Sequence, residues 1–304
     1  MKIRRVGAYG VCRDGAARVL LARNSDASEF PGLWTLPGGG VEQGEHPDTA
    51  VQREFAEETG LDVRLDGLRA VAADLARLPG GDLEHTDRII YDVTAVGGSL
   101  LAEADGTTDL VEWVAPGRLD SRPLMPFTAR VLGRPAGADP IPAEPPADGE
   151  EPLDRPHRVQ RFGAYAVATD PDGRILLTRI APGYPGAGLW HLAGGGTDHG
   201  ESPEQALHRE LAEETSQHGR VTGLRGISHR YDPGALGPEG APIDWHVIRV
   251  LFRVLVDVPT EPVVAEIGGS TAAAAWFAPD QVDALELTEL AREAVAGIAI
   301  EHAR

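Results

Sequence analysis

The sequence predicts two α/β domains that repeat one another. The chain has 304 residues, which is the length of about two average domains. Gly7-Ala8-Tyr9 recurs as Gly163-Ala164-Tyr165, and Gly32-Leu33-Trp34 recurs as Gly188-Leu189-Trp190, both at an offset of 156 residues. Strand-like and helix-like segments alternate within each copy, and this mixture is typical of an α/β domain.

Three segments of the first copy are predicted to be strands. Residues 5–12, 18–23 and 88–96 are apolar or β-branched and are bounded by Gly, Asp and Pro turns. Residues 45–59 have a helical pattern, in which Val51 and Phe55 are spaced to face a core. These elements predict one sheet with an amphipathic helix against it.

The second copy carries the same elements with stronger helix signals. Ser202-Pro203-Glu204-Gln205 predicts a capping box with proline in the first helical turn. Residues 288–302 predict a closing helix. Trp113 and Trp276 are offset by 163 residues, so the second copy has about seven additional residues after its first helix.

The copies are predicted to be domains at 1–132 and 158–304. Residues 133–157 between them contain seven prolines and almost no large apolar side chain. Such a composition favours a semi-rigid extended linker. An acidic arm that docks across one domain is the alternative.

Composition excludes several classes of partner. The net charge of −19 opposes binding to a DNA or RNA polymer. No apolar run approaches the roughly 20 residues of a membrane span, so no membrane partner is expected. A single cysteine, Cys12, cannot form an intramolecular disulfide, which suits a reducing compartment. We expect a cytoplasmic, soluble protein.

Three carboxylates share one arc of the first helix. At about 100° per residue, Glu54, Glu57 and Glu58 point to roughly 0°, −60° and +40°. Their repulsion would be relieved by a divalent cation with oxygen ligands, of which Mg²⁺ is the first candidate and Mn²⁺ the second. The preceding Gly38-Gly39-Gly40 would let backbone approach the cation or a phosphate closely. We also expect Arg53 to pair with Glu45, bracing the loop against the helix.

These residues resemble the signature of the Nudix hydrolases. The pattern G-x5-E-x7-R-E-U-x-E-E-x-G-U, with U an apolar residue, is matched at each fixed position by Gly39, Glu45, Arg53, Glu54, Phe55, Glu57, Glu58, Gly60 and Leu61. The second copy matches with Gly195, Glu201, Arg209, Glu210, Leu211, Glu213 and Glu214. Ser216 and Gln217 then replace the family's glycine and apolar residue, so a different exit from this helix is expected.

The resemblance implies two three-layer α/β/α sandwiches around mixed sheets, and a set of site residues. It implies metal ligands at the carbonyl of Gly38 and at Glu54, Glu57 and Glu58, with Gly194, Glu210, Glu213 and Glu214 corresponding in the second copy. Glu45, Arg53, Glu54 and Glu57 are the expected catalytic group. Substrate contacts are expected from Gly39, Gly40, Arg88 and Trp34, although core packing is the alternative for Trp34.

The family often adds an acidic residue from a loop beyond the signature. Asp109 or Glu112 would serve in the first copy, whereas the matching segment of the second copy is Thr271-Ala272-Ala273-Ala274-Ala275-Trp276. We therefore expect the first copy to carry most of the catalysis.

The resemblance implies hydrolysis of a nucleoside diphosphate linked to a further moiety X, by attack of water at phosphorus. The segment from Gly32 to Gly39 is most similar to the branch that hydrolyses oxidised nucleotides and nucleoside triphosphates. Two alternatives stay open: a nucleotide or nucleotide-sugar sensor with little turnover, and a pyrophosphohydrolase of a specialised biosynthetic pathway. A homodimer and intrachain pairing of the two domains are both compatible with the resemblance.

Overall fold

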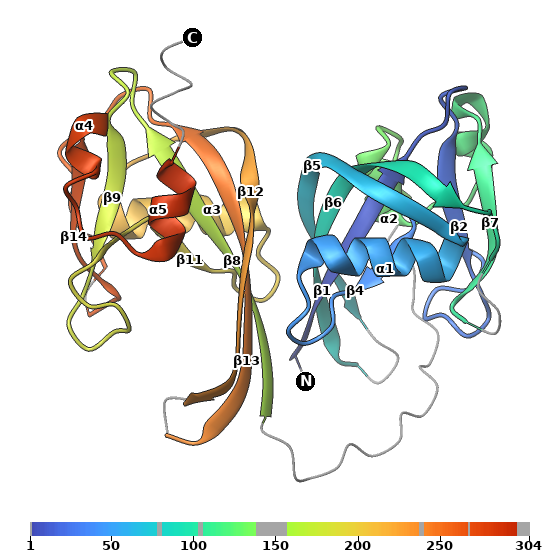
Figure 1. Cartoon of the computed structure of the whole chain (residues 1–304), viewed down its shortest axis with the longest axis horizontal. Coiled ribbons are helices and arrows are strands. Elements are labelled where there is room, and N and C mark those ends of the chain that lie inside the picture. Colours follow the sequence, from blue (N-terminus) through green and yellow to red (C-terminus); the bar gives the residue numbers. More distant parts are fainter. Residues whose placement is uncertain are drawn as a thin grey trace. The chain divides into compact units, whose positions relative to one another are not determined.

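The computed structural model describes residues 2–77, 81–102, 106–137, 157–236, 240–266 and 268–296 (Figure 1). Contacts group the chain into two units, one of Met1–Gln160 with Tyr231–His246 and the other of Arg161–Arg230 with Val247–Arg304. Most of the predicted linker lies outside the described residues. No helix of the described part is long and apolar enough to cross a membrane.

The first repeat contains a mixed sheet and a smaller antiparallel one. The mixed sheet has the order β4-β1-β6-β5, with β1 parallel to β6 and the other pairs antiparallel. The second sheet has the order β3-β2-β7. The strands are β1 (Lys2–Cys12), β2 (Val19–Asn24), β3 (Trp34–Thr35), β4 (Gly38–Gly40), β5 (Leu61–Arg77), β6 (Leu83–Gly98) and β7 (Thr108–Val114).

Helices cover these sheets and bury the predicted apolar stripe. Helix α1 (Pro47–Thr59) buries Val51 and Phe55 completely, and the Phe55 ring packs so close to Gly10 of β1 that a Cβ there would lie 2.5 Å from it. The short helices η1 (Pro116–Ser121) and α2 (Pro126–Val131) close a second core around Trp34. The predicted mixed α/β class is confirmed.

The second repeat has one seven-stranded sheet. Its main order is β10-β9-β8-β13-β12, with β11 paired to β8 and β14 paired to β9. The elements are β8 (His157–Thr169), β9 (Ile175–Ile180), β10 (Trp190–His191), β11 (Ala193–Gly196), α3 (Pro203–Thr215), β12 (Arg220–Leu236), β13 (Pro242–Leu255), β14 (Thr271–Phe277), α4 (Pro279–Val282) and α5 (Glu289–Val295). The predicted closing helix is therefore observed as α5, and its last predicted residues lie outside the described part.

Both long helices begin as the sequence predicts. Pro47 and Pro203 each occupy the first turn. Ser202 accepts a hydrogen bond from the Gln205 backbone N–H, and the Gln205 side chain accepts one from the Ser202 N–H. This reciprocal capping box satisfies two N–H groups that the helix itself cannot pair.

The two helices end in the same left-handed cap, whereas the chain beyond them differs: β5 begins at Leu61, directly after Gly60, and β12 begins at Arg220, four residues after Ser216. Gly60 has φ 68°, Ser216 has φ 54°, and each donates its N–H to the carbonyl four residues earlier. A side chain in this left-handed conformation is unfavourable. The Ser216 hydroxyl offsets the cost by donating a 2.8 Å hydrogen bond to the Val263 carbonyl.

Two substitutions separate these opposing effects at Ser216. Ser216→Ala keeps the left-handed strain and loses the hydrogen bond, so we expect it to lower the free energy of unfolding by about 1 kcal/mol. Ser216→Gly loses the bond but removes the strain, so it should change stability by less than about 0.5 kcal/mol. Urea unfolding measures both, and equal losses would contradict the role given to the hydroxyl.

Candidate active site

Arg53 joins the middle of α1 to the loop that precedes the helix. Its Nε and Nη2 donate to the two carboxylate oxygens of Glu45, each at 3.0 Å, and Nη2 also donates to the Gly40 carbonyl at 3.0 Å. Nη1 donates to Glu54 at 2.9 Å and to Glu57 at 3.0 Å. The predicted Arg53–Glu45 pair is thus present, within a larger network that we call the Arg53 brace.

Hydrogen bonding within the brace and burial have opposing effects on the pKa values of its members. Hydrogen bonding to Glu45 raises the pKa of Arg53. Burial opposes ionisation of Glu45, but the hydrogen bonds from Arg53 prevail and lower its pKa. Burial dominates at Glu54 and raises its pKa despite the adjacent guanidinium. Glu45 is therefore a fixed anion, while Glu54 is a carboxylate with incomplete compensation for its lost hydration.

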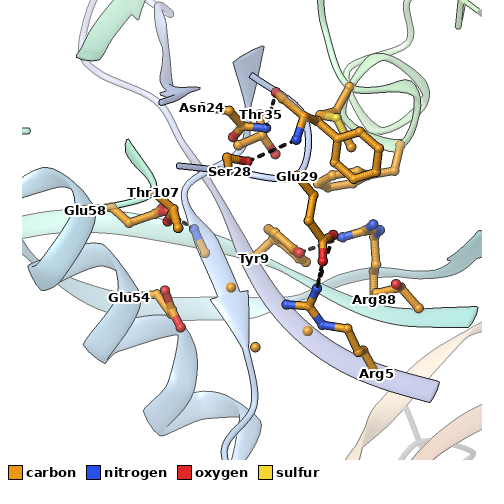
Figure 2. Close-up of a pocket in the computed structure, with 18 of the residues that line it drawn as sticks. Arg5, Tyr9, Asn24, Ser28, Glu29, Thr35, Glu54, Glu58, Arg88 and Thr107 are labelled. Atoms are coloured by element: carbon orange, nitrogen blue, oxygen red, sulfur yellow. Dashed lines mark hydrogen bonds and ion pairs between the residues drawn. The ribbon is translucent and has the colours of Figure 1, made fainter. Parts of the chain in front are cut away.

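Glu54 and Glu58 both face a cavity of about 390 Å³ (Figure 2). Glu58 is held from two sides, because the Gly38 N–H and the Thr108 hydroxyl each donate to it at 2.9 Å. The role of Thr108 was not predicted from the sequence. The repeat of this threonine at Thr271, which donates to Glu214 in the same way, could have indicated it.

The glycines of β4 form one wall of the cavity. A Cβ on Gly39 would lie 2.6 Å from a carboxylate oxygen of Glu54, and one on Gly38 would lie 2.2 Å from the Ala8 carbonyl. Gly40 differs, because a Cβ there would meet nothing within 4 Å. Close approach of the backbone therefore requires glycine at the first two positions and leaves the third open.

Three predicted site residues lie elsewhere. Asp109 is paired with Arg23 at 2.8 Å, and Glu112 is paired with Arg122. The Trp34 side chain is buried in the core beneath η1 and α2. None of the three is among the cavity-lining residues, so the geometry does not support their predicted roles in catalysis or nucleobase stacking.

Arg88 lines the cavity but is already engaged. Its Nε and Nη2 donate to the two carboxylate oxygens of Asp74 at 2.6 and 2.9 Å, and Nη1 donates to the Tyr9 hydroxyl. Its guanidinium lies 4.2 Å from the centre of the Phe127 ring. The bidentate fork expected for phosphate is therefore occupied by Asp74, and Arg88 forms part of the cavity wall.

Comparison with known proteins identifies the family. The NUDIX domain matches residues 1–133 and 159–297. The chain belongs to the NUDIX family of hydrolases. A candidate 8-oxo-dGTP diphosphatase of Bacillus subtilis is 33% identical over 113 residues, which are 37% of this chain and 68% of that protein. A MutT-like protein of Streptomyces ambofaciens is 30% identical over 135 residues, 44% of this chain and 79% of that protein.

Two further similarities each cover less than half of the chain. An ADP-ribose pyrophosphatase of Methanocaldococcus jannaschii is 38% identical over 88 residues, 29% of this chain and 50% of that protein. Among solved structures, a MutT NUDIX hydrolase of Burkholderia pseudomallei is 29% identical, with a TM-score of 0.35 over 45% of this chain and 97% of that one. The family assignment rests on the sequence matches to both repeats.

The second Nudix repeat reproduces the brace. Arg209 donates to both oxygens of Glu201 at 3.0 Å, to Glu210 at 2.8 Å and to Glu213 at 3.2 Å. The Gly194 N–H donates to Glu214 at 2.8 Å. Burial raises the pKa of Glu214 to about 7. Its carboxylate helix is thus built like the first.

One acidic residue of the second repeat was missed by sequence reasoning. The N–H groups of Ala265 and Glu266 both donate to the Glu213 carbonyl, and the charge of Glu266 contributes to the raised pKa values of Glu210 and Glu214. Glu266 lies in the loop before β14 and contacts α3 through its backbone N–H. An acidic loop residue therefore does not distinguish the two repeats, and the expectation of catalysis in the first repeat depends on the cavity beside Glu54 and Glu58.

The oxygen donors at the cavity wall are of the kind that bind a hard divalent cation. Glu54 and Glu58 offer carboxylate oxygens at a glycine-lined wall, and oxygen is the donor that Mg²⁺ prefers. Within the described ranges, no group of three or more His, Cys, Asp or Glu side chains converges in a way that could hold a metal ion. Glu57 does not join Glu54 and Glu58 at the cavity, because its carboxylate is hydrogen-bonded to Arg53 Nη1 in the Arg53 brace.

The matching glycines of the two repeats give a test of this wall. Gly39→Ala would push the Glu54 carboxylate from its position, so we expect at least a tenfold loss of diphosphate hydrolysis with little change in thermal midpoint. Gly195→Ala makes the same change in the second repeat, where a Cβ would lie 2.5 Å from Glu210, and should leave hydrolysis within about twofold of wild type because we expect catalysis mainly in the first repeat. Similar activities in the two variants would contradict the assignment of the wall.

Proposed function

We propose that the protein hydrolyses a diphosphate bond in a nucleoside diphosphate linked to a moiety X, with Mg²⁺ as cofactor and mainly at the first repeat. A nucleoside triphosphate or related nucleotide is the proposed substrate. The supporting observation is the cavity itself, whose wall combines the β4 glycines with Glu54 and Glu58 and continues into a polar recess. The names of the curated relatives, among them nucleoside triphosphatases and an ADP-ribose pyrophosphatase, agree with this substrate class.

In this proposal Glu54, Glu57, Glu58 and the Gly38 carbonyl hold the cation. A bound divalent cation would stabilise the negative charge that develops on phosphoryl oxygens during attack by water. The protein's own contribution is positional. The Arg53 brace fixes Glu54, and the Gly38 N–H and Thr108 hydroxyl fix Glu58. Glu57 would turn from Arg53 toward the cation when it binds.

We place the substrate along this cavity, against the residues that line it. Its diphosphate would rest against Gly39 and Gly40, next to Glu54, and its remaining part would extend toward Tyr9 and Phe127. Preorganised contacts of this kind favour reaction because no reorganisation is needed as charge develops.

Matched substitutions in the two repeats test both the activity and its location. Release of phosphate and pyrophosphate is followed for nucleoside triphosphates, dinucleotides and nucleotide sugars, with Mg²⁺ or with EDTA. Glu54→Gln should reduce kcat at least about 100-fold, because the carboxylate needed at the cavity wall is lost. Glu210→Gln, the same change in the second repeat, should leave kcat within about twofold.

Several outcomes would overturn the proposal. Activity retained by Glu54→Gln and abolished by Glu210→Gln would assign the reaction to the second repeat. Turnover that persists in EDTA would exclude the divalent cation. Absence of hydrolysis across the panel, together with nucleotide-dependent thermal shifts, would favour a nucleotide sensor.

A further inference from the structure

The cavity has a polar recess, lined by acidic and basic side chains. Glu84 and Thr86 of β6 line it together with Arg88, because alternate residues of a strand point to the same face. Arg5 of β1 and Glu29 of the following loop line it as well. Figure 2 shows Glu29 directed toward Arg5, at a distance along the cavity from Glu54 and Glu58.

Glu84 has hydrogen-bonding capacity that the protein does not use. Its side chain is only 8% exposed. The Thr86 hydroxyl donates to Oε1 at 3.3 Å, and Arg5 Nη1 lies 3.7 Å from the same oxygen. Within the part of the chain that the structure describes, Oε2 receives no hydrogen bond. A carboxylate has about four acceptor positions, so Glu84, which lines the cavity, keeps acceptor positions that a ligand could use.

The cations of the recess are shared with other acids. Arg5 Nη1 lies 3.4 Å from both carboxylate oxygens of Glu29, and Arg88 is held by Asp74 and Tyr9. Neither guanidinium is therefore reserved for Glu84. A ligand that donates hydrogen bonds to this carboxylate would complete its partners inside the cavity, and hydrogen bonds to a charged acceptor are stronger than those to a neutral one.

Apolar side chains line the same cavity as this acceptor, namely Phe30, Met125 and Phe127. A flat ring or a sugar could pack against them while its polar edge meets Glu84. The recess thus suits a moiety that is apolar on its face and a hydrogen-bond donor at its edge.

The second repeat lacks this carboxylate. His85 and Arg88 match His246 and Arg249 at an offset of 161 residues, which sets Trp245 opposite Glu84. The difference is not required by the fold, because both repeats belong to the same family. It marks Glu84 as a feature of the first site alone.

We propose that Glu84 determines the specificity of the first repeat by accepting hydrogen bonds from two adjacent donors on the substrate. The guanine edge, with its ring N1–H and 2-amino group, and the vicinal hydroxyls of ribose both have this chemistry. The inference rests on the proposed function, because it places the substrate in the same cavity. Glu84 acts on binding and selectivity, while Glu54 and Glu58 serve the reacting phosphates.

Nucleotides that differ by one donor test the proposal. kcat/KM is measured for GTP, for ITP, which lacks the 2-amino group, and for dGTP, which lacks the 2′-hydroxyl. Loss of a hydrogen bond to a charged acceptor costs about 10- to 100-fold. If guanine is the source, the GTP/ITP ratio of wild type should be at least 10 and should fall to within about twofold of unity in Glu84→Gln.

If ribose is the source, the GTP/dGTP ratio should collapse instead. Glu29→Gln is the control, because it removes the other acidic partner of Arg5 and leaves Glu84 in place. It should preserve whichever ratio wild type shows. Ratios unchanged by Glu84→Gln, or altered equally by Glu29→Gln, would overturn the proposal. Thermal midpoints of both variants check that the fold is retained.

Binding separates this inference from the proposed activity. If wild type hydrolyses none of the three nucleotides, thermal shifts with the same compounds are compared in wild type and Glu84→Gln. Shifts that discriminate the nucleotides only in wild type would retain the role of Glu84 and reject hydrolysis. Equal shifts in both proteins, or no shift with any compound, would reject the role of Glu84.

Discussion

The site of the first repeat depends on one guanidinium. Arg53 contacts three carboxylates and a backbone carbonyl, so the loop, the β4 strand and the middle of α1 are tied together at a single group. Its rigid planar fork suits this task better than a lysine ammonium would. The glycine wall follows from the same arrangement, because the brace leaves the Glu54 carboxylate in the space that a Cβ on Gly39 would occupy.

The parts of this site that were predicted from sequence are local in the chain. Arg53, Glu54 and Glu57 are separated by helical spacings that bring them onto one side of α1, and Glu45 lies only two residues before the helix begins. The signature positions match without gaps, so the helix, its glycine turn and the Arg53–Glu45 pair were all predictable. The capping box at Ser202 was predictable for the same reason.

The parts that were not predicted depend on contacts distant in sequence. In the sequence, Arg88 is a candidate phosphate ligand. In the structure, the pairing of β5 with β6 places Asp74 against its guanidinium. Thr108 reaches Glu58 across 50 residues, and Glu266 reaches α3 through a loop whose path the sequence pattern does not fix. Strand register and loop path decide these contacts, and neither follows from periodicity.

The most direct test of this account compares Arg53→Lys with Arg209→Lys by initial-rate kinetics on the nucleotide that wild type hydrolyses. The two arginines make matching contacts in the two repeats, so each variant controls for the structural effect of the other. The account predicts that Arg53→Lys lowers kcat at least about 100-fold and that Arg209→Lys leaves it within about twofold. Equal losses, or a loss confined to Arg209→Lys, would contradict it.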